Sequence, residues 1–109
     1  MIVQRFLLKS LTTKEHSMAS KMIRRGTLSE LVCTQELVQE GYDVFWPVAD
    51  QGMVDIVAIN PTTGNIRLIE VKTLGRRRDG TRIYRTTTTP QKKIGVEIIE
   101  VDLDEYPHV

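Results

Sequence analysis

Apolar residues recur with the period of a helix in one part of the chain and in short β-branched runs elsewhere. From about Ile23 to Glu40 they recur every three or four residues, and Gly41 follows, which predicts a helix of this extent. A second, short helix is predicted at 88–95, where a threonine can cap its start and a glycine can close it. Runs typical of strands lie at 42–48, 54–60, 67–72, 81–87 and 96–103. This order of elements predicts a fold of the α/β (α+β) class.

The first 22 residues show no clean periodicity, because serines and threonines interrupt their apolar positions. We expect an N-terminal arm or a short helix at 1–22, followed by a single domain at 23–109. The apolar run in this arm is too short to span a membrane, and no signal peptidase site follows it. We therefore expect a cytoplasmic protein without a membrane partner.

Three charged residues, Asp55, Glu70 and Lys72, interrupt two of the apolar strands, which a turn at 61–64 joins. If all four turn residues form the loop, Asp55 lies directly opposite Glu70. A two-residue loop pairs Asp55 with Lys72 instead, yet it keeps all three side chains on one face, because side chains alternate with period two. A three-residue loop without a compensating bulge would break this arrangement.

Two carboxylates between apolar strands need a cation, since opposed like charges destabilise a sheet and desolvation of a charge is costly. Lys72 is one candidate, and a hard divalent ion such as Mg²⁺ is another, because it binds carboxylate and phosphate oxygens. The simpler alternative is a structural ion pair between Lys72 and one of the acids. We favour a functional site, because buried ion pairs add little net stability.

Histidine and cysteine are scarce in the 109 residues, which limits the chemistry that the chain can perform. Cys33 is the single cysteine, so no internal disulfide and no cysteine-based zinc cluster can form within one chain. The two histidines, His16 and His108, lie near opposite ends, which disfavours a Ser–His–Asp triad. Carboxylates are therefore expected to carry any catalysis.

The formal net charge of +1 conceals a strongly basic stretch that begins at the third charged residue of the hairpin. Only one acid interrupts this stretch, whose members are Lys72, Arg76, Arg77, Arg78, Arg82, Arg85, Lys92 and Lys93. Such a patch suits the phosphates of nucleic acid even when the total charge is near zero. The alternative is a solvated basic loop, which is common for a run of arginines.

On the long helix, Glu30 projects among apolar residues and towards the core side, so we expect it to reach the same polar site. Its neighbour Ser29 projects outward with the surface glutamates. Phe45 and Trp46 are expected to pack in the core or on a face of the sheet. Asp50, in the turn before the hairpin, could add a further acidic group.

A helix bearing Glu30, followed by Asp55 and by the triplet Glu70-Val71-Lys72, resembles the PD-(D/E)XK nuclease superfamily, whose fold is called restriction-endonuclease-like. The resemblance covers most of the chain, from about residue 26 to residue 103. Three segments are similar to small stand-alone members such as archaeal-type Holliday junction resolvases, namely 26–31, 41–45 and 69–73. The triplet alone is a weak signal, but its order and spacing relative to the two other acids are specific. The resemblance implies an αβββαβ core in which helices flank a mixed central sheet.

The resemblance also implies a role for each matching residue. Asp55 and Glu70 would bind Mg²⁺, with Mn²⁺ as a substitute, and the Val71 carbonyl and Glu30 would complete the metal shell. Lys72 would orient or help to deprotonate the attacking water. Val54 stands where the superfamily motif has its proline, a substitution that is common in the superfamily.

Gln91 matches a position where related nucleases carry a glutamine near the active site, although it could equally be an exposed residue of a short polar helix. Together these features predict a Mg²⁺-dependent endonuclease that binds DNA through residues 76–93. It would be either structure-specific, like a Holliday junction resolvase, or a small site-specific or repair endonuclease. We expect a homodimer, since a small chain covers little DNA and two active sites suit the cutting of two strands. The alternative is a non-catalytic nucleic-acid-binding or assembly subunit with the same fold.

Overall fold

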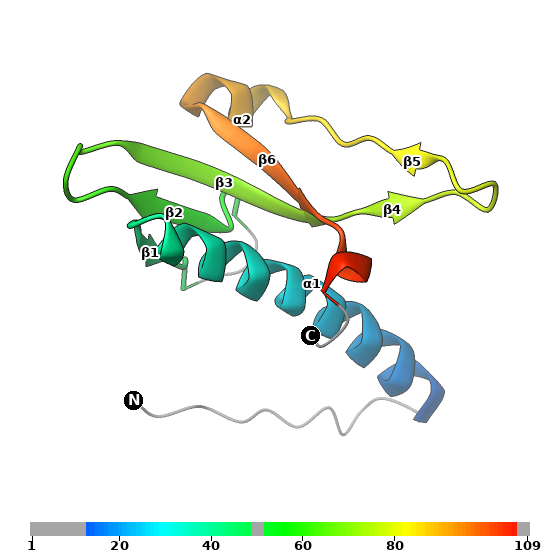
Figure 1. Ribbon diagram of the computed structural model, residues 1–109. Helices are drawn as coiled ribbons and strands as arrows, with labels where there is room; N and C mark the ends of the chain where they lie inside the picture. Colours follow the sequence, from blue (N-terminus) through cyan, green and yellow to red (C-terminus); the bar gives the residue numbers. More distant parts are fainter. Residues whose placement is uncertain (1–12, 49–51, 107–109) are drawn as a thin grey trace.

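One long helix and one short helix lie on opposite faces of a four-stranded sheet (Figure 1). The computed structural model describes residues 13–48 and 52–106. Its elements are α1 (Thr13–Gln39), β1 (Asp43–Phe45), β2 (Ile56–Ile59), β3 (Ile66–Thr73), β4 (Gly75–Arg76), β5 (Arg82–Ile83), α2 (Thr89–Ile94), β6 (Val96–Val101) and the 3-10 turn η1 (Leu103–Glu105). In these ranges no helix is long and apolar enough to cross a membrane.

The central sheet has the strand order β1-β2-β3-β6. β1 and β3 both run antiparallel to β2, whereas β6 runs parallel to β3. A parallel neighbour requires a crossover, and the segment from β4 to α2 provides it. The protein therefore has an α+β fold with a mixed sheet, and this part of the prediction is confirmed.

Asn60 and Asn65 pair across the turn beyond the ends of β2 and β3, so the loop that they close has the four residues 61–64, and the predicted register with the longer loop is confirmed. Ile56 pairs with Ile69 and Ile59 pairs with Ile66, and the N–H of Asn60 donates to the Asn65 carbonyl at 2.8 Å. The side-chain oxygen of Asn60 also accepts hydrogen bonds from two backbone N–H groups of the loop, which tightens the turn. The ladder ends at the Ile56–Ile69 pair, and the N–H of Asp55 also donates to the Ile69 carbonyl, so Asp55 does not continue the ladder to the predicted position directly opposite Glu70.

The start of α1 differs from the prediction, because the helix begins at Thr13 rather than near Ile23. Residues 13–22 of the predicted arm are therefore helical, and residues 1–12 lie outside the described residues. The core forms between this helix and one face of the sheet. It includes Cys33 and Leu37 from α1 and Ile56 and Ile69 from β2 and β3.

The buried stripe of α1 is rotated from the predicted one. Ser29 is only 1% exposed, and its hydroxyl lies 2.6 Å from the Thr73 hydroxyl at the end of β3, so the outward orientation predicted for it is wrong. A residue as small as serine lets the helix approach the strand closely, and the two hydroxyls satisfy one another. Leu31 and Val38, on the other side of the helix, are exposed. Phe45 is likewise more than half exposed, because it belongs to the short edge strand β1.

The basic segment after β3 contains two short strands. β4 and β5 pair antiparallel as a separate two-stranded ribbon, which projects beyond the end of the main sheet (Figure 1). The strand predicted at 81–87 is reduced to Arg82–Ile83. The predicted short helix is confirmed as α2, with Thr88 as its N-cap and Gly95, at φ 78°, as its C-cap.

Candidate active site

Asp55 lies immediately before β2, where the ladder between β2 and β3 ends. Its N–H donates to the Ile69 carbonyl at 2.8 Å, and its Oδ2 accepts a hydrogen bond from the N–H of Val71 at 2.7 Å. Ile69 and Val71 point into the core beneath the sheet. Because side chains alternate along a strand, Glu70 and Lys72 lie on the opposite face from α1.

Glu70 is held by one contact on each of its carboxylate oxygens. Lys72 Nζ lies 2.9 Å from Oε1, and Gln91 Nε2 donates to Oε2 at 2.7 Å. The side chain of Glu70 is 18% exposed, while that of Lys72 is more open to solvent. The structure therefore brings the predicted lysine and this predicted acid into direct contact.

Gln91 connects α2 to the site, and the alternative of an exposed glutamine is wrong. The residue is 4% exposed, and its Nε2 also donates to the Met53 carbonyl at 2.9 Å. Its Oε1 accepts from the N–H of Thr88 at 2.8 Å, which completes a capping box at the start of α2. The capping threonine, visible in the sequence, was the signal that this side chain turns back towards its own helix start.

Glu30, on α1, meets Asp55 at a pocket whose described lining does not include Glu70 or Lys72. It lines a pocket of about 130 Å³ together with Trp46, Pro47 and Asp55. Trp46 is 55% exposed, contrary to the packed position predicted for it, and its indole N–H donates to the Thr34 hydroxyl at 3.2 Å. The pocket thus brings Glu30 of α1 close to Asp55, just before β2. Asp50 lies outside the described residues.

The donors around Asp55 match the chemistry of a hard cation, because they are carboxylate and carbonyl oxygens. The N–H and C=O of one strand residue point to the same side, so the Val71 carbonyl faces the side on which Asp55 lies. In the described part of the chain, however, no three His, Cys, Asp or Glu side chains form a group that could hold a metal ion. The residues predicted to hold such an ion are Asp55, Glu70 and the Val71 carbonyl, with Glu30 at the adjoining pocket.

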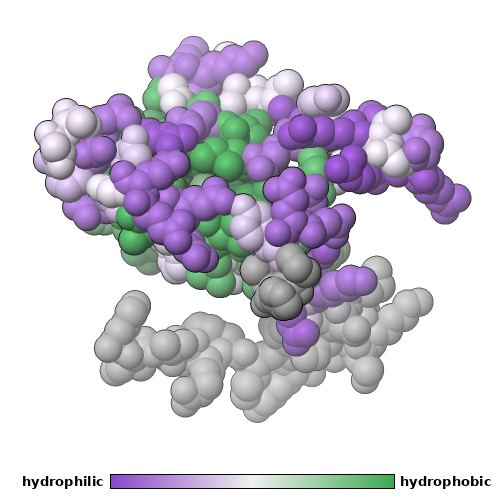
Figure 2. Space-filling view, viewed as in Figure 1, coloured by the Kyte–Doolittle hydropathy of each residue, from purple (hydrophilic) through white to green (hydrophobic). Residues whose placement is uncertain are grey.

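The predicted DNA-binding residues divide into two groups. Arg76 and Arg82 are tied to the C-terminal end of β6, at 3.6 Å from Asp102 and 3.1 Å from Glu100. The others are exposed, as Arg76 and Arg82 also are, and Figure 2 shows hydrophilic side chains over the ribbon and over α2. Among them, four make no side-chain hydrogen bond or ion pair within the described ranges, namely Arg78, Arg85, Lys92 and Lys93.

Glu100 belongs to the same face of the sheet, although the sequence did not indicate it. In the parallel ladder it is the register partner of Lys72. Its Oε1 binds Arg82, and its Oε2 is buried without a hydrogen-bond partner. The register between β3 and β6 depends on the long crossover between them, so the sequence carried no signal for this neighbour.

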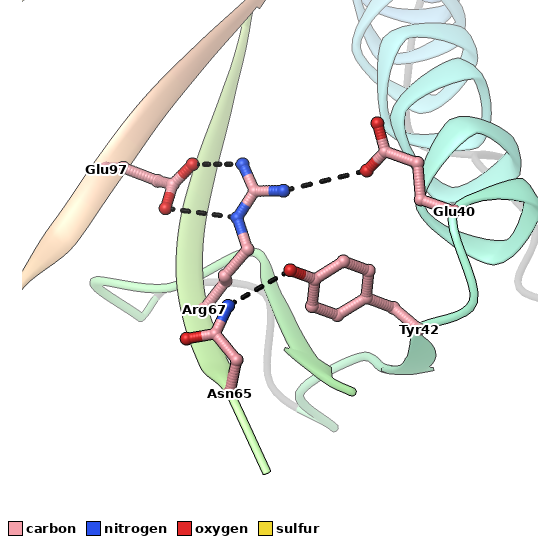
Figure 3. Close-up of polar contacts among 5 residues, drawn as sticks. All are labelled: Glu40, Tyr42, Asn65, Arg67 and Glu97. Atoms are coloured by element: carbon pink, nitrogen blue, oxygen red, sulfur yellow. Dashed lines mark hydrogen bonds and ion pairs between the residues drawn. The ribbon is translucent and has the colours of Figure 1, made fainter. Parts of the chain in front are cut away.

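A second polar cluster surrounds Arg67 of β3 and includes none of the predicted site residues (Figure 3). The guanidinium of Arg67 makes two hydrogen bonds to Glu97 and lies 3.8 Å from a carboxylate oxygen of Glu40. It also stacks over the Tyr42 ring, 5.6 Å from its centroid. The hydrogen bonds to Glu97 raise the pKa of Arg67 above its usual value, so the cluster stays charged and joins α1, β3 and β6.

The lone cysteine is not part of the site. Cys33 lies in the core beneath the sheet, and burial raises the pKa of its thiol to about 11. A thiol with this pKa is almost wholly protonated at neutral pH and is a poor nucleophile or metal ligand. The carboxylates and Lys72 remain the groups available for chemistry.

Comparison of the chain with protein-family models, with curated proteins and with solved structures finds no match.

Proposed function

We propose that this protein is a Mg²⁺-dependent endonuclease that hydrolyses DNA phosphodiester bonds and has a restriction-endonuclease-like core. One observation carries the proposal. Asp55, just before β2, accepts a hydrogen bond from the N–H of Val71, the residue after Glu70 on β3, and the ammonium of Lys72 lies 2.9 Å from Glu70. Carboxylates that can hold a dication beside a lysine are the groups that phosphodiester hydrolysis needs.

The residues that would hold Mg²⁺ are Asp55, Glu70 and the Val71 carbonyl, with Glu30 acting from the adjoining pocket. A bound Mg²⁺ would lower the pKa of a coordinated water and neutralise charge on the phosphate. Asp55 is oriented for this role by the hydrogen bond from the N–H of Val71. That bond uses one of its two oxygens, so the other remains to face a ligand.

Lys72 supplies positive charge where a phosphate would approach and can orient the attacking water. Its side chain is 40% exposed, so the ammonium can reach a substrate without a rearrangement of the strand. Gln91 positions Glu70 through the 2.7 Å hydrogen bond, which fixes one carboxylate oxygen and leaves the other towards Lys72. We regard Gln91 as a positioning residue in this scheme, because its contacts are to protein groups.

The cations on the ribbon and on α2 support DNA as the substrate. Arg78, Arg85 and Lys92 are exposed, and no acid within the described ranges neutralises them, so they can contact phosphates. The ribbon adjoins the end of β3 that carries Lys72, which places this phosphate track next to the candidate site. A homodimer belongs to the same proposal, because two sites suit the cutting of two strands of a duplex or a junction.

A second candidate function is a non-catalytic DNA-binding subunit. It is favoured by the contacts of Glu70, whose two carboxylate oxygens are already bound by Lys72 and Gln91. In that case Lys72 is a structural counterion rather than a catalytic group. The two functions share the basic surface and differ in whether strand cleavage accompanies binding.

Nicking of a supercoiled plasmid distinguishes these functions. The wild-type protein is incubated with Mg²⁺ or Mn²⁺ across a range of pH, beside the variant Glu70→Gln and the surface control Asp104→Asn. Binding of the same DNA is followed by fluorescence anisotropy in EDTA. An endonuclease nicks the plasmid only with metal and loses this activity in Glu70→Gln, whereas binding without nicking under every condition supports the subunit.

A further inference from the structure

We propose that Glu100 is a positioning residue that accepts the ammonium of Lys72 when a divalent cation binds Asp55 and Glu70. The inference rests on the proposed function, because it concerns the metal-loaded state of the same site. Oε2 of Glu100 is buried without a hydrogen-bond partner, and Glu100 is the register partner of Lys72 on the neighbouring strand.

The carboxylate of Glu100 is satisfied on one oxygen only. Oε1 lies 3.1 Å from a guanidinium nitrogen of Arg82, and the side chain is 14% exposed. Oε2 is the single buried side-chain nitrogen or oxygen in residues 20–48 and 52–106 that has no hydrogen-bond partner. Buried polar atoms without partners are rare and often mark a functional role, since the desolvation of a polar atom that makes no hydrogen bond is costly.

The neighbour that could satisfy this oxygen is Lys72. The two residues are register partners in the parallel ladder between β3 and β6, so their side chains leave the same face of the sheet. Adjacent strands lie about 4.8 Å apart, a distance that a lysine side chain spans easily. Glu70, in contrast, faces Ile98 on β6, which cannot compete for the ammonium.

A bound dication supplies the reason for Lys72 to move. In the structure Lys72 Nζ lies 2.9 Å from Oε1 of Glu70, and the Glu70 carboxylate is a proposed metal ligand. A metal ion on Glu70 repels a like charge at this distance and competes with it for the same oxygen. With Glu100 available, Lys72 exchanges one carboxylate for another and stays beside the site, while Arg82 keeps the Glu100 side chain in place.

The test measures metal affinity rather than catalysis. Mn²⁺ is titrated into the full-length protein by isothermal titration calorimetry, and thermal melts verify the fold of each variant. We expect Glu100→Gln to bind Mn²⁺ roughly tenfold more weakly than the wild type, which corresponds to about 1.4 kcal/mol. The matched control is Asp102→Asn, which removes the other ion pair at the base of the ribbon and should leave the affinity within about twofold.

A double-mutant cycle separates a specific partnership from a general loss of negative charge. In a Lys72→Met background no ammonium needs a second acceptor, so Glu100→Gln should have no further effect on Mn²⁺ affinity. If Glu100→Gln proves too unstable, Glu100→Asp replaces it, with an intermediate affinity expected because the carboxylate is kept but shortened.

The outcomes separate the inference from the proposed function. If the wild type binds no Mn²⁺ at millimolar concentration, the metal site fails and the inference falls with it. If the wild type binds Mn²⁺ but Glu100→Gln matches the Asp102→Asn control, the inference alone is overturned. The same holds if the Glu100→Gln effect persists unchanged in the Lys72→Met background.

Discussion

Replacement of Gln91 by methionine tests the contact that joins α2 to the candidate site. The change keeps the length and approximate volume of the side chain but removes every hydrogen bond that it makes. These are the bonds to Glu70 at 2.7 Å and to the Met53 carbonyl at 2.9 Å, and the bond accepted from Thr88 at 2.8 Å. Since the residue is 4% exposed, water cannot replace them without a rearrangement.

The expected cost follows from the chemistry of each bond. A hydrogen bond to a charged acceptor contributes about 1.5 to 3 kcal/mol and a neutral bond about 1 kcal/mol. Loss of half of a capping box costs roughly a further 1 kcal/mol. Because contributions of one side chain overlap, we expect Gln91→Met to lower the free energy of unfolding by about 3 kcal/mol.

Urea denaturation followed by circular dichroism gives this free energy by linear extrapolation. The matched control is Lys92→Met, the next residue of the same helix, which is exposed and should change stability by less than about 0.5 kcal/mol. A loss below 1 kcal/mol in Gln91→Met, with an unchanged slope against urea, would show that Gln91 does not tie α2 to Glu70.

Further predictions concern Cys33, Arg67 and Arg78. Because burial raises the pKa of the Cys33 thiol from 9.0 to about 11, Ellman's reagent at pH 8 should modify it rapidly only in urea, and rapid reaction of the native protein would contradict its burial. The raised pKa also means that the stability provided by the neutral thiol is complete below pH 9 and is lost as the pH rises towards 11, so Cys33→Ala should show a smaller decline than the wild type. Arg67→Lys should cost about 1 to 2 kcal/mol in urea unfolding, because lysine cannot reproduce the paired bonds to Glu97, whereas an equal effect of Arg85→Lys would point to a nonspecific cause. If the ribbon binds phosphate, Arg78→Gln should lower the slope of log K for DNA against log salt by about 0.9, and the same change at Lys21 on α1 should not.

The register of the hairpin was predictable because its determinants are local. The turn chemistry between Asn60 and Asn65 and the alternation of side chains are both written in neighbouring residues. The same holds for α2, whose threonine and glycine caps bound it. The hairpin brings Asp55 beside Val71, and α2 brings Gln91 beside Glu70.

Features that depend on how distant segments pack were not predictable from single positions. The orientation of α1 depends on its approach to the end of β3, so Ser29 proved to be buried rather than exposed. The proximity of Glu100 to Lys72 depends on the register of a parallel pair separated by a long crossover. The exposure of Trp46 depends on β1 lying at the edge of the sheet.

Cleavage assays on four substrates, a four-way DNA junction, a linear duplex, single-stranded DNA and RNA, test the assignment of the site most directly. The wild type and Asp55→Asn are compared with Mg²⁺ at equal concentration, after circular dichroism has shown that both are folded. Asparagine keeps an oxygen for the N–H of Val71 but removes the charge. We expect metal-dependent cleavage of at least one DNA substrate, slowed in Asp55→Asn by roughly two orders of magnitude, or about 3 kcal/mol. Undiminished cleavage by Asp55→Asn would contradict the assignment of this site.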